Sequence, residues 1–135
     1  MSWYQALLGK WTSWFAGMSK AKTPVTRSSA EQASVENKAA YLTLYELRSC
    51  HYSAKVRHHL KWLNVPVATK DLKRCHIYQK ELLAGGGRAQ VPCLKIEKPS
   101  GTEWLYESQD IIDYLDRKFA PKSFLDKSNK SKQAA

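Results

Sequence analysis

One cysteine stands where an apolar segment of the chain gives way to an amphipathic one. Cys50 follows the alternating segment 41–47 and precedes residues 52–63, in which apolar residues recur at helical spacing. The first turn of a helix presents unpaired N–H groups and the positive end of the helix dipole, and both stabilise a thiolate. A lowered thiol pKa favours attack on disulfides. This position therefore indicates a nucleophile, and a small buried cysteine is the alternative.

Two neighbours of Cys50 can tune its reactivity. Ser53, in the same predicted helix, can donate a hydrogen bond to the thiolate and so lower the thiol pKa. Protonated His51 would also stabilise the thiolate, and reactivity would then fall as pH rises through the titration of the imidazole. A neutral, exposed His51 would do little. Cys50, Ser53 and His51 are the candidate catalytic residues.

The remaining cysteines and histidines give weaker indications. Cys93 lies in a strand pattern that turns it into the core, which favours a structural role over a resolving one, and Cys75 is interpreted in the same way. His58 and His59 are adjacent and point to different parts of a helix surface, and His76 has no partner at helical spacing. We therefore expect no metal site. The sequence also carries no hydrolase or phosphate-loop pattern.

The elements that must position these residues alternate along the chain. Strands are predicted at 41–47, 67–72, 91–96 and 102–106, and helices at 52–63, at about 75–83 and from Ser108, the expected N-cap, to the stop at Pro121. A right-handed crossover places the second strand parallel to the first, and the turn at 99–101 makes the last two strands a hairpin. The three glycines at 85–87 are expected to end the second helix. The order is βαβαββα.

Length and composition limit the interpretation. The 135 residues can form one domain with a core and are too few for two of ordinary size. Three cysteines, an odd number without a Cys-x-x-Cys pair, do not indicate a secreted disulfide framework, so we expect a reducing, cytoplasmic location. The net charge of +10 lies largely in the two tails. Such tails are usually solvated, and we do not expect nucleic acid as a partner.

The chain ends are interpreted as separate segments. Residues 1–18 carry three tryptophans and a tyrosine on one face of an amphipathic helix that is too polar to span a bilayer. This face suits a membrane surface, while packing on its own domain or self-association with a second copy are alternatives. Residues 19–39 are expected to be a flexible linker, with a short helix over 29–40 as the alternative. The folded domain is expected at 40–120, and 121–135 as a disordered basic tail.

Three segments together resemble glutaredoxins and the amino-terminal glutathione-binding domain of glutathione transferases. They are Cys50-His51-Tyr52-Ser53, the segment 87–93 and the segment 107–112. The resemblance implies an α/β, thioredoxin-like three-layer sandwich with a mixed four-stranded sheet, preceded here by the amphipathic amino-terminal helix. No carboxy-terminal all-helical domain follows, so the chain looks like a stand-alone glutaredoxin-like domain.

The resemblance implies glutathione as the cofactor. The implied binding residues are Tyr52, Arg88, Gln90, Val91, Pro92, Glu107 and Ser108. Pro92 matches the family's cis-proline, which turns the backbone of Val91 toward the thiol so that glutathione can pair with it like an added strand.

The two ends of glutathione are assigned by the same resemblance. Glu107 and Ser108 match the turn that receives the γ-glutamyl end, where a helix amino terminus favours a carboxylate and an acidic side chain can pair with an ammonium. Arg88 and Gln90 are near enough in sequence to reach the glycine carboxylate. Ordinary solvation in a loop is the alternative for these two side chains.

The departures from the family pattern decide the expected mechanism. Dithiol members have a second cysteine three residues after the first, whereas this chain has Ser53 there and His51 after the nucleophile. The resemblance therefore implies a monothiol, glutathione-dependent oxidoreductase that acts on glutathionylated proteins. The alternatives are an iron-sulfur cluster module like the Cys-Gly-Phe-Ser relatives, a transferase- or isomerase-like domain, and an inactive glutathione-binding adaptor.

Overall fold

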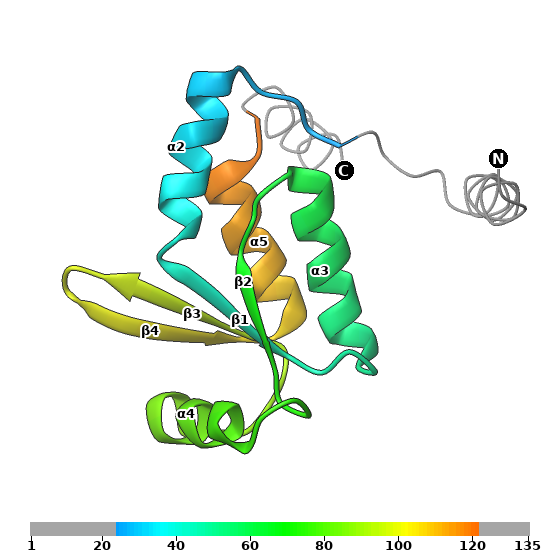
Figure 1. Cartoon of the computed structure of the whole chain (residues 1–135), viewed down its shortest axis with the longest axis vertical. Coiled ribbons are helices and arrows are strands. Elements are labelled where there is room, and N and C mark those ends of the chain that lie inside the picture. Colours follow the sequence, from blue (N-terminus) through cyan, green and yellow to red (C-terminus); the bar gives the residue numbers. More distant parts are fainter. Residues whose placement is uncertain (1–23, 122–135) are drawn as a thin grey trace, which may run out of the picture.

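A computed structural model of the chain describes residues 24–121 (Figure 1). Its elements are α2 (Ser29–Ala39), β1 (Leu42–Glu46), α3 (His51–Leu63), β2 (Ala68–Asp71), α4 (His76–Gly86), β3 (Cys93–Lys98), β4 (Gly101–Tyr106) and α5 (Ser108–Phe119). From β1 onward the order is the predicted βαβαββα. The helix expected at 1–18 and the tail expected beyond Pro121 lie outside the described residues.

The four strands form one mixed sheet in the order β2-β1-β3-β4. β1 and β2 run parallel, and β3 is antiparallel to both β1 and β4. Helices α2, α3 and α5 lie on one side of the sheet, and α4 lies on the other (Figure 1). This arrangement is the thioredoxin-like fold, so the predicted fold class is confirmed. None of the helices in the described part is both long and apolar enough to span a bilayer.

Alternation along the strands divides the core between the two faces of the sheet. Leu44 and Leu94 face α3 and α5, while Tyr45 and Cys93 face α4, and all four are fully buried. Successive side chains of a strand point to opposite faces, so neighbouring residues join different clusters. The core under α4 is the smaller one and is built around Leu82.

The segment before β1 is docked on the domain. Residues 29–39 form a helix, which was the alternative to the expected linker, and its Val35 and Ala39 join the core beneath α3 and α5. Arg27 Nη2 donates a hydrogen bond of 2.8 Å to the carbonyl of Phe119, and Val25 N donates one of 2.8 Å to the carbonyl of Trp62. These bonds reach the last turns of α5 and α3. The sequence indicated this helix only weakly, because few residues of the helix are apolar.

Helix α4 runs further than predicted, through the first two of the three glycines. It ends at Gly86, and its C-cap, Gly87, has a φ of 86° in the left-handed region that glycine adopts at low cost. Gly85 lies against the ring of Trp104, and Gly86 lies against the hydroxyl of Tyr106, so closely that a Cβ atom at either position would clash. Gly85 and Gly86 therefore allow α4 to approach β4 closely, and only Gly87 acts at the end of the helix.

Candidate active site

Cys50 occupies the junction between β1 and α3. It is the N-cap of α3, with its carbonyl accepting a hydrogen bond of 3.0 Å from Ala54 N and its own N–H donating one of 3.0 Å to Leu47 O. The sulfur makes no capping bond, and the residue is partly exposed. The thiol is thus placed at the positive end of a helix of 13 residues and in reach of solvent.

The surroundings of Cys50 favour the thiolate. Burial raises the pKa of the Cys50 thiol, but hydrogen bonds from the N–H and hydroxyl of Ser53, the N–H of Tyr52 and the charge of Arg57 outweigh it, leaving the pKa below its ordinary 9.0. Ser53 is fully buried. Its hydroxyl also accepts a hydrogen bond of 3.4 Å from Leu47 N, which ties the loop to the helix.

Arg57 is itself held by a buried carboxylate. Its Nη1 donates a hydrogen bond of 2.8 Å to Oε2 of Glu46, the last residue of β1, which is 2% exposed. A buried carboxylate is stable only when paired, so Glu46 fixes the guanidinium beside the first turns of α3. Neither residue was predicted as part of the site, because their pairing depends on how α3 crosses β1.

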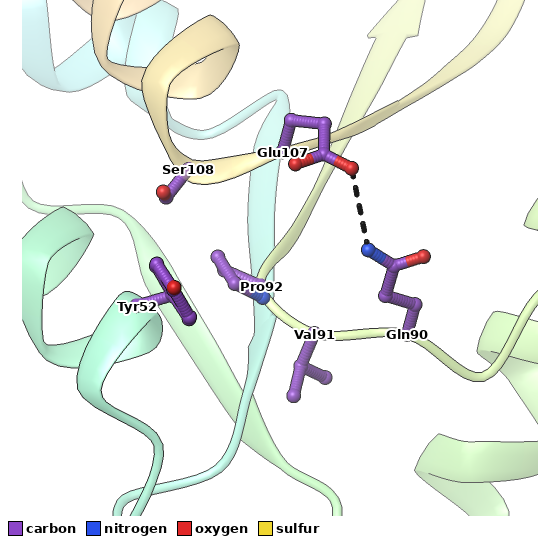
Figure 2. Close-up of a pocket in the computed structure, with 6 residues that line it drawn as sticks. All are labelled: Tyr52, Gln90, Val91, Pro92, Glu107 and Ser108. Carbon is purple, nitrogen blue, oxygen red and sulfur yellow. Dashed lines mark hydrogen bonds between the residues drawn. The ribbon is translucent and has the colours of Figure 1, made fainter.

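A groove of about 280 Å³ opens beside the first turn of α3 (Figure 2). It is lined by Tyr52, Gln90, Val91, Pro92, Glu107 and Ser108. The six side chains come from three segments that are far apart in sequence: α3, the loop before β3 and the start of α5. Figure 2 shows Pro92 between the Tyr52 ring and Gln90, with Ser108 and Glu107 at the amino terminus of α5.

The loop that forms one wall of the groove is anchored at several points. The Val91–Pro92 peptide bond is cis. Gln90 Nε2 donates a hydrogen bond of 3.4 Å to Oε1 of Glu107, which joins this loop to the start of α5. Tyr106 Oη donates one of 2.9 Å to the carbonyl of Arg88. Tyr106 was not a predicted site residue, because the sequence placed it only in the strand at 102–106.

The opposite wall of the groove begins with an unusual backbone. Glu107, rather than the predicted Ser108, is the N-cap of α5, and its φ of 72° is uncommon for a residue with a side chain. Residues held in such conformations cluster at functional sites. Ser108 is instead the first residue of the helix. The groove wall therefore combines an exposed carboxylate with the positive end of the α5 dipole.

The structure brings together six of the seven residues that the resemblance assigned to glutathione. Arg88 is the exception, because it does not line the groove and its guanidinium instead lies 4.4 Å from the centroid of the Tyr106 ring. Cys50 does not line the groove either, whereas Tyr52, two residues later in the chain, does. His51 is exposed, and its ring lies edge-on to that of Tyr52 at 5.9 Å.

The other thiols differ in their surroundings. Cys93 is fully buried between β3 and α4, and burial raises the pKa of its thiol to about 11, although the nearby Tyr106 hydroxyl and the charge of Arg88 act in the opposite direction. Cys75 is partly exposed and is the N-cap of α4. Among residues 24–121, no three side chains of His, Cys, Asp or Glu gather in a way that could hold a metal ion.

Solved structures similar to this chain include transferases, an isomerase and a glutaredoxin. Maleylacetoacetate isomerase from Anaeromyxobacter dehalogenans, with bound dicarboxyethyl glutathione and citrate, is 22% identical over 60% of this chain and 38% of its own, with a TM-score of 0.47. Glutathione transferase E6 from Drosophila melanogaster is 28% identical over 62% and 40%, with a TM-score of 0.47. Holo glutaredoxin C1 from Populus tremula x tremuloides is 16% identical over 68% and 91%, with a TM-score of 0.45.

The chain spans less than half the length of the isomerase and the transferase. No curated protein matches it. The family model of the glutathione S-transferase N-terminal domain, however, matches residues 44–123, which is more than half of the 135-residue chain. This match includes Cys50, Ser53 and the whole groove. The chain therefore belongs to the glutathione S-transferase N-terminal domain family.

Proposed function

We propose that this domain binds glutathione in the groove and uses Cys50 to reduce glutathione mixed disulfides of proteins. The proposal rests on one observation: the same helix, α3, positions both the candidate nucleophile and one of the residues that line the groove. Cys50 is the N-cap of α3 and has a lowered thiol pKa, and Tyr52 in the first turn of the same helix lines the groove. A sulfur held in this groove would lie beside a thiolate, the form of cysteine that attacks disulfides.

The groove offers the groups that a tripeptide with charged ends requires. An extended backbone can pair with the main chain at Val91 as an added strand would. The Glu107 carboxylate suits the ammonium of the γ-glutamyl end, and the amino terminus of α5 at Ser108 suits its carboxylate. Gln90 lies on the loop wall with Val91, and the amide proton that it does not donate to Glu107 can be donated to a carboxylate of the ligand. We assign Arg88 no contact with the ligand.

The reaction consists of two thiol-disulfide exchanges. In the first, the Cys50 thiolate attacks the glutathione sulfur of the mixed disulfide. The protein–glutathione S–S bond breaks, the protein thiolate leaves and takes a proton, and a Cys50–glutathione disulfide forms. In the second, the thiolate of another glutathione attacks this disulfide, which releases oxidised glutathione and restores the Cys50 thiolate. One free glutathione is consumed as the reductant in each cycle.

A monothiol cycle follows from the residues around the nucleophile. Ser53 stands at the position from which a second cysteine would resolve the intermediate, and it stabilises the thiolate instead. Cys93 is buried with its thiol pKa raised to about 11, so it stays protonated at neutral pH and is a poor nucleophile. The free glutathione must therefore release the product.

The test compares two cysteine variants of the full chain. We expect Cys50→Ser to abolish turnover of a small glutathione mixed disulfide and to retain binding of glutathione in titration calorimetry. Cys75→Ser is the matched control, because Cys75 is also a partly exposed N-cap, and it should retain turnover. Equal turnover by wild type and Cys50→Ser would exclude the redox proposal.

A second candidate function is glutathione conjugation or isomerisation. Membership of the glutathione S-transferase N-terminal domain family favours it. Here the groove would activate the thiol of glutathione, and Cys50 would not form a covalent intermediate. Conjugation of an electrophile that persists in Cys50→Ser, together with no mixed-disulfide turnover by the wild type, would select this candidate.

A further inference from the structure

Two loops of the same length meet at the edge of the sheet that carries Cys50. The parallel pairing of β1 and β2 places Glu46 opposite Asp71, and the carbonyl of Glu46 accepts a hydrogen bond of 3.0 Å from Leu72 N. Four residues after each strand the chain reaches the N-cap of a helix, Cys50 for α3 and Cys75 for α4. The carboxyl ends of parallel strands lie at one edge, so both loops border the nucleophile.

These two loops and the helix starts that follow them carry a group of basic side chains, which we call the basic rim. The basic rim consists of Arg48, His51, Lys73, Arg74 and His76, all of them exposed. Within the described residues, none of its three fixed cations forms an ion pair. These charges are therefore available to a partner.

Few acidic side chains lie near the basic rim, and those that do already interact with other groups of the domain. The chain has no Asp or Glu between Leu47 and Lys70. Glu46 is buried and paired with Arg57, and the carboxylate of Asp71 accepts a hydrogen bond of 3.0 Å from Lys73 N. The edge around Cys50 therefore has an excess of positive charge, because Arg48, Lys73 and Arg74 outnumber the one carboxylate, Asp71, that is not paired with a cation.

The other side of the groove has the opposite charge. Glu107 and Asp110, at the start of α5, are exposed. A partner that reaches the thiol thus meets positive charge around the loops and negative charge near α5. Complementary charge of this kind steers the encounter and fixes the orientation of a partner more than it adds affinity.

We propose that the basic rim binds an acidic segment of the protein substrate, so that the preferred substrates are glutathionylated proteins whose modified cysteine is flanked by Asp or Glu. This inference rests on the proposed reaction at Cys50. A protein is favoured over the other polyanions because the rim surrounds a nucleophile whose reaction needs a sulfur, which nucleic acids and phospholipids do not bring. The glutathione part of the substrate would occupy the groove, and the acidic segment would lie over the loops.

The experiment compares turnover of three peptides that carry the same glutathionylated cysteine, flanked by glutamate, glutamine or lysine. At low ionic strength we expect kcat/KM of the glutamate peptide to exceed that of the lysine peptide by about 10-fold or more, the range that charge steering produces. In about 1 M salt, which screens charges beyond about 3 Å, the three values should converge. Equal values at low salt would overturn the inference.

The variant Arg48→Gln/Lys73→Gln/Arg74→Gln removes the fixed charges of the rim. It should lower kcat/KM for the glutamate peptide toward that of the glutamine peptide and leave turnover of a mixed disulfide of glutathione with a small uncharged thiol unaffected. The matched control, Lys38→Gln/Lys61→Gln/Arg117→Gln, removes the same number of exposed charges from α2 and from the last turns of α3 and α5. An equal loss in this control would show a general charge effect and overturn the inference.

A binding measurement separates this inference from the proposed reaction. The Cys50→Ser protein is titrated with a labelled glutamate-rich peptide without cysteine, with duplex DNA and with vesicles containing phosphatidylserine. We expect the peptide to bind most tightly and to depend on the rim charges. Tighter binding of DNA or vesicles would overturn the inference. Rim-dependent peptide binding by a chain that turns over no mixed disulfide would instead refute the reaction alone.

Discussion

The guanidinium of Arg57 lies 2.8 Å from the carboxylate of Glu46, and this pair joins the end of β1 to α3, the helix that Cys50 caps. Glu46 is 2% exposed, so the carboxylate depends on Arg57 for its partner. The same guanidinium lowers the pKa of the Cys50 thiol. One ion pair thus contributes both to the fold and to the acidity of the candidate nucleophile.

Changes at the two ends of this pair should move the thiol pKa in opposite directions. Glu46→Gln frees the charge of Arg57, so the pKa of Cys50 should fall, whereas Arg57→Gln removes the charge and should raise it. Arg57→Gln should lose about 1–3 kcal/mol of unfolding free energy, because the buried Glu46 carboxylate is left without its partner. Glu46→Gln should lose less, because its amide oxygen can still accept a hydrogen bond from the partly exposed Arg57. The rate of thiol alkylation against pH measures the pKa. Glu36→Gln, at an exposed position in α2, is the control and should leave the pKa of Cys50 unchanged. If Glu46→Gln and Arg57→Gln shifted this pKa in the same direction, the role assigned to the ion pair would be wrong.

Ser53→Ala should make Cys50 less reactive at neutral pH. The substitution removes the hydroxyl hydrogen bond that lowers the pKa of the Cys50 thiol, and it leaves the backbone bonds in place. One such bond is worth about 1 kcal/mol, so alkylation near neutral pH should slow about 5-fold. The measurement is the alkylation rate between about pH 5 and 10. Ser49→Ala, in the exposed part of the same loop, should leave the rate unchanged.

Cys93 should make the fold less stable at alkaline pH. Burial raises the pKa of its thiol from 9.0 to about 11, so the unfolded chain loses this proton first as pH rises. The stabilising contribution of the thiol is therefore complete below pH 9.0 and is lost up to about pH 11. At about 1.36 kcal/mol per pKa unit, the loss amounts to about 2–3 kcal/mol.

Urea unfolding of wild type and Cys93→Ala across this pH range tests the prediction. The alanine variant loses packing volume at every pH, but only the wild type should lose the thiol contribution. The difference in unfolding free energy between the two should therefore shrink as pH rises. Tyr45, whose pKa burial raises to about 12, titrates in both proteins and cancels in the comparison. A difference that does not change with pH would contradict the raised pKa.

Gly86→Ala should weaken both the fold and the groove. A Cβ atom at this position would clash with the Tyr106 hydroxyl, whose hydrogen bond to the carbonyl of Arg88 anchors the loop before β3. Overpacking of this kind costs about 1–3 kcal/mol. We expect lower unfolding free energy in urea and weaker glutathione binding in calorimetry. The double variant Gly86→Ala/Tyr106→Phe removes the nearest clashing atom and should recover part of the lost stability, but not the anchored loop.

Arg27→Ala should loosen the segment before β1. The side chain donates hydrogen bonds to the carbonyls of Phe119 and Asn64, at the ends of α5 and α3. Loss of a charged donor from such bonds costs about 1.5–3 kcal/mol. Amide exchange of α2 should accelerate, and the unfolding free energy should fall. Arg117→Ala, at an exposed position in α5, is the control, and unchanged exchange of α2 in Arg27→Ala would show that the segment is held in another way.

Much of the fold was predictable because it depends on local patterns. Period-two alternation located the four strands, helical spacing located the helices that follow Cys50 and Ser108, and the family segments indicated the thioredoxin-like topology. The helix at 29–39 was weakly predicted, because only Val35 and Ala39 of its residues are buried. Its position is held by hydrogen bonds to distant carbonyls, for which a sequence pattern gives no signal.

The sequence by itself determined which residues can do chemistry: a cysteine at a strand–helix junction, Ser53 in place of a second thiol, and three segments that resemble those of glutathione-binding domains. Only the tertiary structure decided which of them meet. It brings Tyr52, Gln90 and Glu107 to one groove but turns Arg88 onto Tyr106. It also pairs Arg57 with Glu46. Such contacts depend on how helices cross the sheet, and this is set by the packing of the whole core rather than by the spacing of residues along the chain.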